Sequence, residues 1–153
     1  MEGNIETKKN KLLENFIGIL LIMPIYMLVF IAINLLDLNC DGNIVLPITI
    51  YLPVIIGMVL INMIYKDKMS EEVNFFAVIF LGIAIFTWCM NAFIEWDGFD
   101  GLWVIGIWIL STIALKICAC FNYGRIVGWK KTKIFFSVYM VLLILSLMLG
   151  FWA

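Results

Sequence analysis

Two short polar turns carry the residues whose types and spacing could bind a metal ion. Residues 37–43 match the opening of a calcium-binding loop, D-x-[DN]-x-[DN]-G, in which oxygen ligands alternate along the chain. The twelfth position departs from that pattern, because it is Ile48 rather than Glu. With a second turn at 95–101, the candidate ligands are Asp37, Asn39, Asp41, Glu95, Asp97 and Asp100. The alternative is that short turns favour Asp, Asn and Gly for backbone reasons alone.

The residue types that most enzymes use are missing or scattered. The 153-residue sequence contains no His, which removes the commonest general base, pH switch and metal ligand together. Its four cysteines show neither a CxxC pair nor the spacing of a disulfide framework. The long apolar runs contain no Asp or Glu, whereas proton-coupled transporters and charge-selective pores place ionised groups there. We therefore expect no enzymatic activity and no cofactor.

The composition indicates a membrane protein. Hydrophobic residues make up 65% of the chain and charged residues 14%, and the mean hydropathy is +1.09. A soluble domain would be about half apolar and about a quarter charged. So small a globule could not hide the excess, so lipid must cover it. A spanning helix needs about 20 apolar residues, and five such runs occur: 16–36, 44–64, 73–94, 102–121 and 134–152.

The predicted fold is therefore an all-α, polytopic membrane bundle. It comprises a cytoplasmic N-terminal segment, 1–15, and a single transmembrane domain, 16–153, with five spanning helices. Four spans are the alternative, because the second run carries Pro47 and Pro53 and the fifth is the shortest.

The distribution of basic residues predicts the orientation. All Lys and Arg residues except Lys116 lie in three segments that would share one side of the membrane: 1–15, 65–72 and 122–133. Cytoplasmic loops collect such residues, so we expect the N-terminus inside and the C-terminus outside. Lys116 lies near the inner end of the fourth run and should snorkel its ammonium to the headgroups. The net charge of −1 does not indicate a nucleic-acid partner.

Two prolines and two faces of small or polar residues lie inside the apolar runs. Pro24 and Pro53 should kink their helices, either as a hinge or as ordinary compensated kinks. The residues that recur at helical spacing are Asn74, Ala77, Ala84, Thr87 and Asn91 in the third run and Ser111, Ala114 and Cys118 in the fourth. We expect these faces to pack helices together, since close contact of small residues drives association in lipid; the alternative is that they line an aqueous path.

The segment 122–133 combines positive charges with aromatic anchors. Its candidate contact residues are Arg125, Trp129, Lys130, Lys131 and Lys133. Headgroup binding is the first interpretation, worth about 1 kcal/mol per basic residue near an anionic surface. The second is docking of an acidic cytosolic protein.

In size, number of spans and lack of a soluble domain, the chain resembles small accessory proteins of the bacterial inner membrane. Immunity proteins against pore-forming bacteriocins and membrane subunits of phage-defence systems are examples. This resemblance is architectural and rests on no shared motif. It implies a non-enzymatic membrane subunit that acts through protein contacts, as an oligomer or with a partner at the cytoplasmic face. The alternatives are a pore-forming or membrane-perturbing effector, and a small-solute or ion transporter.

Overall fold

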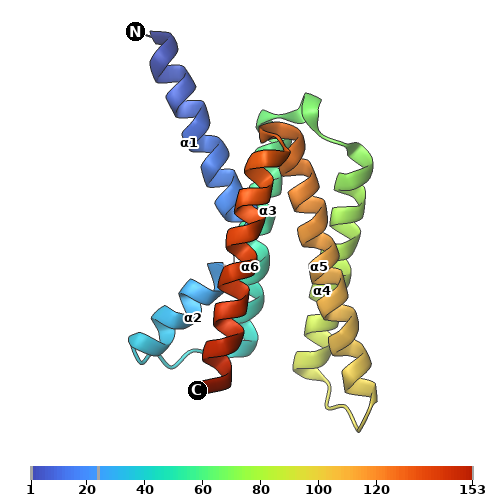
Figure 1. The fold of residues 1–153 in the computed structure, drawn as a ribbon. Coiled ribbons are helices and arrows are strands. Elements are labelled where there is room, and N and C mark those ends of the chain that lie inside the picture. Colours follow the sequence, from blue (N-terminus) through green and yellow to red (C-terminus); the bar gives the residue numbers. More distant parts are fainter. Residues whose placement is uncertain (1, 24, 153) are drawn as a thin grey trace.

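The part of the chain that can be described is almost entirely helical. The computed structural model describes residues 2–23 and 25–152, and no strand occurs within these ranges (Figure 1). The elements are α1 (Glu2–Ile22), α2 (Ile25–Leu35), α3 (Gly42–Ile64), the one-turn 3-10 helix η1 (Lys66–Lys68), α4 (Glu71–Phe93), α5 (Asp100–Val127) and α6 (Trp129–Trp152). The prediction of an all-α fold is confirmed.

Among the residues that the structure describes, three helices are long and apolar enough to cross a membrane. They comprise Ile44–Ile64 of α3, all of α4 and all of α5. In lipid a backbone must satisfy its own polar groups, which a helix does within one segment, so apolar runs of this length become helices. The chain is therefore a helical membrane protein, and the second, third and fourth predicted spans fall on these three helices.

The start of α4 shows how local sequence sets a helix boundary. Ser70 has an extended backbone, and its Oγ accepts a hydrogen bond from the backbone N–H of Val73 at 3.4 Å. Glu71 and Glu72 occupy the first turn, where carboxylates interact favourably with the helix dipole. These residues end the polar connection after η1 and begin the apolar helix.

The first predicted span, 16–36, is not one continuous helix. Helix α1 ends at Ile22 and α2 begins at Ile25; Pro24, the predicted kink, lies outside the described residues. The N–H of Ile25 donates to the carbonyl of Met23 at 2.9 Å, so the carbonyl of Leu21 loses its usual helical partner. With 11 residues, α2 rises about 16 Å, roughly half the hydrocarbon thickness of a bilayer.

Helix α3 is continuous, unlike the first apolar run, and the kink predicted at Pro53 stays a prediction. It contains both Pro47 and Pro53 and still continues from Gly42 to Ile64. Pro53 therefore does not end its helix, and the chain concentrates its break in the first apolar run.

The predicted connection 122–133 is also wrong as a loop. Helix α5 continues to Val127 and α6 starts at Trp129, with only Gly128 between them. Gly128 has φ of 90°, a left-handed backbone that glycine adopts without strain, and its N–H caps the carbonyl of Gly124. The basic residues of this segment thus lie on two helix ends that meet at one sharp turn.

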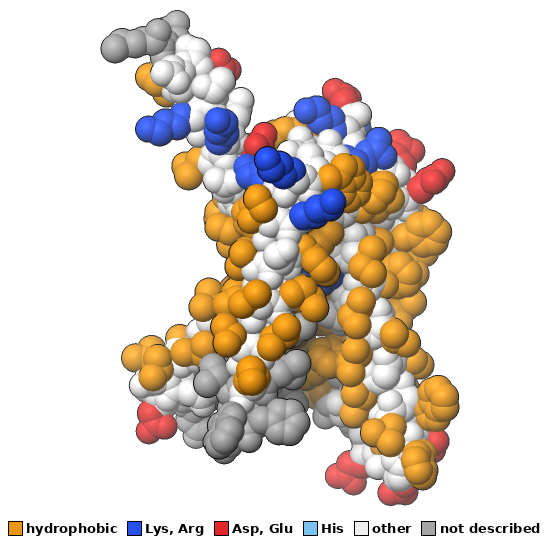
Figure 2. Space-filling view, viewed as in Figure 1, with side chains coloured by type: hydrophobic (Ala, Val, Ile, Leu, Met, Phe, Trp, Pro, Cys, Tyr) orange, Lys and Arg blue, Asp and Glu red, His pale blue; other side chains and the backbone are white. Residues whose placement is uncertain are grey.

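The helices form two groups that are arranged side by side (Figure 1). The second half of α1 lies against α3, α5 and α6, while α4 and α5 form a hairpin with the most extensive contact in the molecule. The buried core runs between the groups and includes Leu21, Val54, Leu115 and Tyr123. Most basic side chains gather where α3 meets η1 and α5 meets α6, here called the basic end (Figure 2).

Candidate functional site

The α4–α5 contact uses the small-residue face predicted for α4. Ala77, Ala84 and Thr87 are buried there, and Thr87 bonds back to the Ile83 carbonyl at 2.8 Å, which satisfies its hydroxyl within α4. Asn91 is exposed and lies outside the contact. The predicted face is therefore occupied over its middle section.

The facing side of α5 is turned slightly from the predicted one. Ser111 is buried, but the face continues through Leu115 and Ala119 at spacings of four, and both are buried. Ala114 and Cys118 are only half-buried beside it. The predicted face contained small residues only. The observed face includes a leucine, because the small alanine side chains of α4 leave room for a larger side chain on α5.

Three asparagines join α3, α4 and α5 near the basic end. Asn74 donates to Oδ1 of Asn62 at 2.8 Å and accepts from Nδ2 of Asn122 at the same distance. Asn74 therefore occupies the centre of a chain of amides across three helices. The Oδ1 atom of Asn122 is buried and accepts no hydrogen bond from the described residues.

Replacing Asn74, at the centre of this chain of amides, should lower the free energy of unfolding more than replacing Asn122 at its end. Asn74→Leu breaks two hydrogen bonds, and such bonds in membranes average about 0.6 kcal/mol with a maximum near 1.7, so we expect a loss of about 1–2 kcal/mol. Asn122→Leu breaks one bond and also removes a buried acceptor that has no donor, so its cost should be below about 1 kcal/mol. Unfolding by SDS titration from mild detergent measures both, and equal losses would contradict this ordering.

A second polar cluster joins α3 to α5 deeper in the bundle. Trp108 Nε1 donates to the hydroxyl of Tyr51 at 2.6 Å, and that hydroxyl also lies 3.0 Å from Oγ1 of Thr112. The indole of Trp88 contacts that of Trp108, with ring centroids 5.1 Å apart. Each polar atom here has a partner, which is how polar groups are tolerated at membrane depth.

The junction after α1 contains the only charged side chain within the apolar runs. Lys116 of α5 donates from Nζ to the carbonyl of Leu21 at 2.9 Å, the carbonyl that the break after Ile22 leaves without a helical partner. The ammonium also lies 5.9 Å from the ring centroid of Tyr139 in α6. A cation at a helix C-terminus is favourable because the carbonyls there carry partial negative charge.

The prediction that Lys116 snorkels to the headgroups is therefore wrong. Its ammonium is directed to the end of α1, so α1, α5 and α6 meet around one charge. No carboxylate among the described residues pairs with it. An ionised residue at membrane depth is by default a candidate functional group, and this one could bind an anion or hold a helix end.

Helix α1 is held against its neighbours by two glycines. A Cβ built on Gly18 would lie 2.5 Å from Oη of Tyr123 in α5, and one built on Gly57 of α3 would lie 2.8 Å from Cδ2 of Leu21. The Tyr123 hydroxyl donates to the carbonyl of Glu14 at 3.1 Å. The tyrosine ring therefore lies directly on the α1 backbone, a contact that the sequence analysis did not anticipate.

At the basic end, α1 makes one ion pair with α6. Nζ of Lys131 lies 3.6 Å from Oε2 of Glu14. Burial and, second, the nearby Glu14 carboxylate raise the pKa of Tyr65, which precedes η1. Glu14 of α1 thus lies close to α6 and to Tyr65, the residue after α3, and it joins the start of the apolar run to the basic end.

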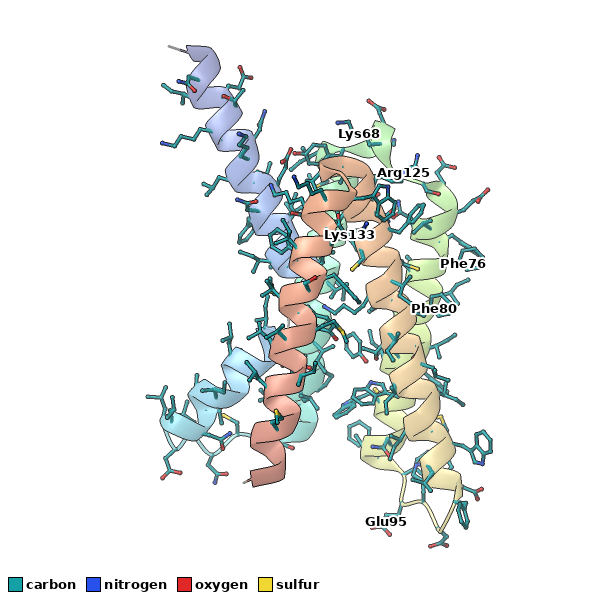
Figure 3. The ribbon with its side chains drawn as sticks, in the orientation of Figure 1. Lys68, Phe76, Phe80, Glu95, Arg125 and Lys133 are labelled. Carbon is teal, nitrogen blue, oxygen red and sulfur yellow. The ribbon has the colours of Figure 1, made fainter. Side chains whose placement is uncertain are left out.

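Of the contact residues predicted at the basic end, one packs against its neighbours and three have exposed side chains. Trp129 covers Gly124, where a Cβ would lie 3.0 Å from the indole, and it contacts Phe121 edge to face. Arg125, Lys130 and Lys133 are exposed. Figure 3 shows Arg125 and Lys133 at the same end as Lys68, opposite to Glu95.

The structure does not bring the side chains of the two acidic turns together in the described residues. No group of three or more Cys, Asp and Glu side chains is placed to hold an ion there. The turn at 37–43 joins α2 to α3, whereas Glu95, Asp97 and Asp100 join α4 to α5 in the other helix group (Figure 1). Asp37 has φ of 51°, as in a tight turn, which fits the backbone interpretation of these residues.

The comparisons with known proteins assign no class to this fold or site. No protein-family model matches the chain, and neither a curated protein nor a solved structure matches it. The function must therefore be argued from the geometry alone.

Proposed function

We propose that the chain crosses a bacterial cytoplasmic membrane five times, with its N-terminus in the cytoplasm and its C-terminus outside. The second half of α1 and α2 would together make the first crossing, and α6 the fifth. The support is the gathering of Lys and Arg at one end of the helices, since cytoplasmic segments collect such residues (Figure 2).

The native Cys40 gives a direct test of this orientation. It is exposed in the turn between α2 and α3, so a membrane-impermeant maleimide should label it in intact cells. A cysteine introduced as Lys130→Cys, in a background that carries Cys40→Ser and Cys89→Ser because Cys89 is also exposed, should react only after permeabilisation. Labelling of both positions in intact cells would contradict the orientation.

We further propose that the protein is a non-enzymatic membrane subunit that acts through helix–helix contacts, first of all with a second copy of itself. The observation that carries this proposal is the uncovered face of α4. Only 17% of the most apolar stretch of α4 is buried, the same share as in α5 and about half of the 33% in α3, and on α4 the exposed residues form one continuous stripe. The face opposite the α5 contact is a stripe of exposed residues at spacings of three and four: Phe75, Ile79, Gly82, Phe86 and Cys89.

Gly82 gives this stripe the shape of a packing surface. A Cβ built on Gly82 would meet nothing within 4 Å, so no contact inside the chain requires glycine there. Glycine on a lipid-facing helix lets a second backbone approach closely, and aromatic residues supply large contact areas. Phe75 lies two turns before Gly82 and Phe86 lies one turn after it, so both rings would flank such a contact.

Gly82→Leu tests this interface. We expect the wild-type protein in mild detergent to give an oligomer by native mass spectrometry, and Gly82→Leu to shift it at least tenfold toward the monomer. Oxidation should also link two copies through Cys89, which is exposed on the same face. Leu81→Met, which lies off this stripe on a side chain that is partly buried against the core and changes volume little, is the matched control. A wild-type monomer that forms no Cys89 cross-link would contradict the proposal.

A second candidate function is passage of an ion or small solute. It is favoured by one observation, the Lys116 ammonium at the end of a discontinuous helix, because transporters often place coupling sites where membrane helices are broken. Flux through proteoliposomes that Lys116→Met abolishes would support it. An equal flux in that variant and in the wild type would argue against this site.

A further inference from the structure

Helix α1 has an exposed apolar stripe that extends beyond the helix bundle. Ile5, Leu12, Phe16 and Ile19 recur at spacings of seven, four and three, which places them on one side of the helix. Ile5 is 69% exposed and Leu12 72% exposed, although both lie N-terminal to the apolar run. The opposite side of α1, with Ile17 and Leu21, is buried in the bundle.

Basic residues flank the outer part of this stripe. Lys8 and Lys9 fall on either side of it, three and four residues after Ile5, and both are exposed. Lys11 adds a third charge on the same helix, while Glu14 is engaged by Lys131. Figure 2 shows basic and apolar side chains close together on the projecting part of α1.

We infer that residues 3–12 of α1 bind the anionic lipid headgroups beside the basic end of the protein. The stripe continues through Phe16 and Ile19 into the apolar run, so its outer half extends a surface that already faces lipid. Apolar side chains flanked by lysines are the pattern by which helices lie at a membrane interface, and each lysine near an anionic surface adds to the attraction. The contact therefore needs both the lysines and the apolar residues.

Hydrogen exchange of the full-length protein in nanodiscs tests this inference. One set contains phosphatidylcholine alone, and the other contains 30% phosphatidylglycerol. We expect the amides of residues 3–12 to exchange at least tenfold more slowly with the anionic lipid. The difference should shrink in 1 M salt, where the Debye length falls to about 3 Å.

Two variants separate the stripe from general effects on the protein. Lys8→Gln with Lys9→Gln should return the exchange rate to its value in phosphatidylcholine, and Leu12→Gln should do so in part. Asn10→Gln, on the far side of the helix from the stripe, should leave the protection unchanged. Unaltered exchange in α3 and α4 shows that each variant is folded.

Exchange that is equal in the two lipids would overturn the inference. Protection of residues 3–12 that appears only on addition of an acidic soluble protein would also overturn it, since the surface would then bind a protein instead of lipid. Neither result depends on whether α4 forms an oligomer.

Discussion

Replacing Gly18 with alanine should loosen α1 from the bundle. The new Cβ would lie 2.5 Å from Oη and 2.6 Å from Cζ of Tyr123, a side chain with no exposed surface. The ring cannot move aside without breaking its hydrogen bond to the carbonyl of Glu14. Because overpacking a close-packed contact typically costs about 1–3 kcal/mol, we expect a loss of that size, measured by SDS titration from mild detergent.

Alanine substitutions of Gly57 and Gly106 serve as comparisons for the loss of stability expected at Gly18. Gly57→Ala brings a Cβ within 2.8 Å of Cδ2 of Leu21, the end of a more flexible side chain, so its cost should be smaller. Gly106→Ala meets nothing within 4 Å and should be neutral or slightly stabilising, since alanine is the better helix former. A variant at Gly18 as stable as the one at Gly106 would mean that α1 does not lie against Tyr123.

Replacing Lys116 with glutamate should have the second large effect. A carboxylate at this position would face the carbonyl of Leu21, so two acceptors would replace a charged hydrogen bond of 2.9 Å. An uncompensated charge buried in this way costs on the order of 3–5 kcal/mol. We expect the protein to lose its monodisperse elution in mild detergent, with a large fall in unfolding free energy.

Further substitutions of Lys116 separate the effect of side-chain charge on stability from the effect of side-chain size. Lys116→Met loses a charged hydrogen bond worth about 1.5–3 kcal/mol, but it also removes the cost of holding a charge in lipid, so its net effect should be smaller. Lys116→Arg keeps a donor and a charge and should stay closest to the wild type. Equal stability of the glutamate and methionine variants would contradict a bond to the end of α1.

Both predictions concern the contact between α1 and α5: Gly18 belongs to α1, and Lys116 belongs to α5. Tyr123 holds the α1 backbone before the break, and Lys116 holds its last turn. A cation that replaces a missing N–H donor makes the discontinuity after Ile22 stable at depth, where an unsatisfied carbonyl is costly. If the protein conducts or transports, this is where we expect variants to alter flux.

The broad features of this protein are determined by its sequence alone. Hydropathy and helix length suffice for an all-helical membrane protein, because the cost of unsatisfied backbone in lipid leaves few other solutions. The periodicity of Ala77, Ala84 and Thr87 likewise identifies the buried face of α4, since small residues must lie where helices come closest. Both inferences depend on interactions within one segment.

Only the tertiary structure decided which contacts join the segments. The sequence places Lys116 near the end of an apolar run. The same sequence pattern fits a lysine that snorkels to the headgroups and a lysine bonded to Leu21. Nor does it distinguish Pro53, which α3 accommodates, from the break after Ile22, or show that Gly18 lies under Tyr123. The physical reason is that the partner of a polar group or a glycine in lipid is supplied by another helix, and that partner is fixed only when the helices pack.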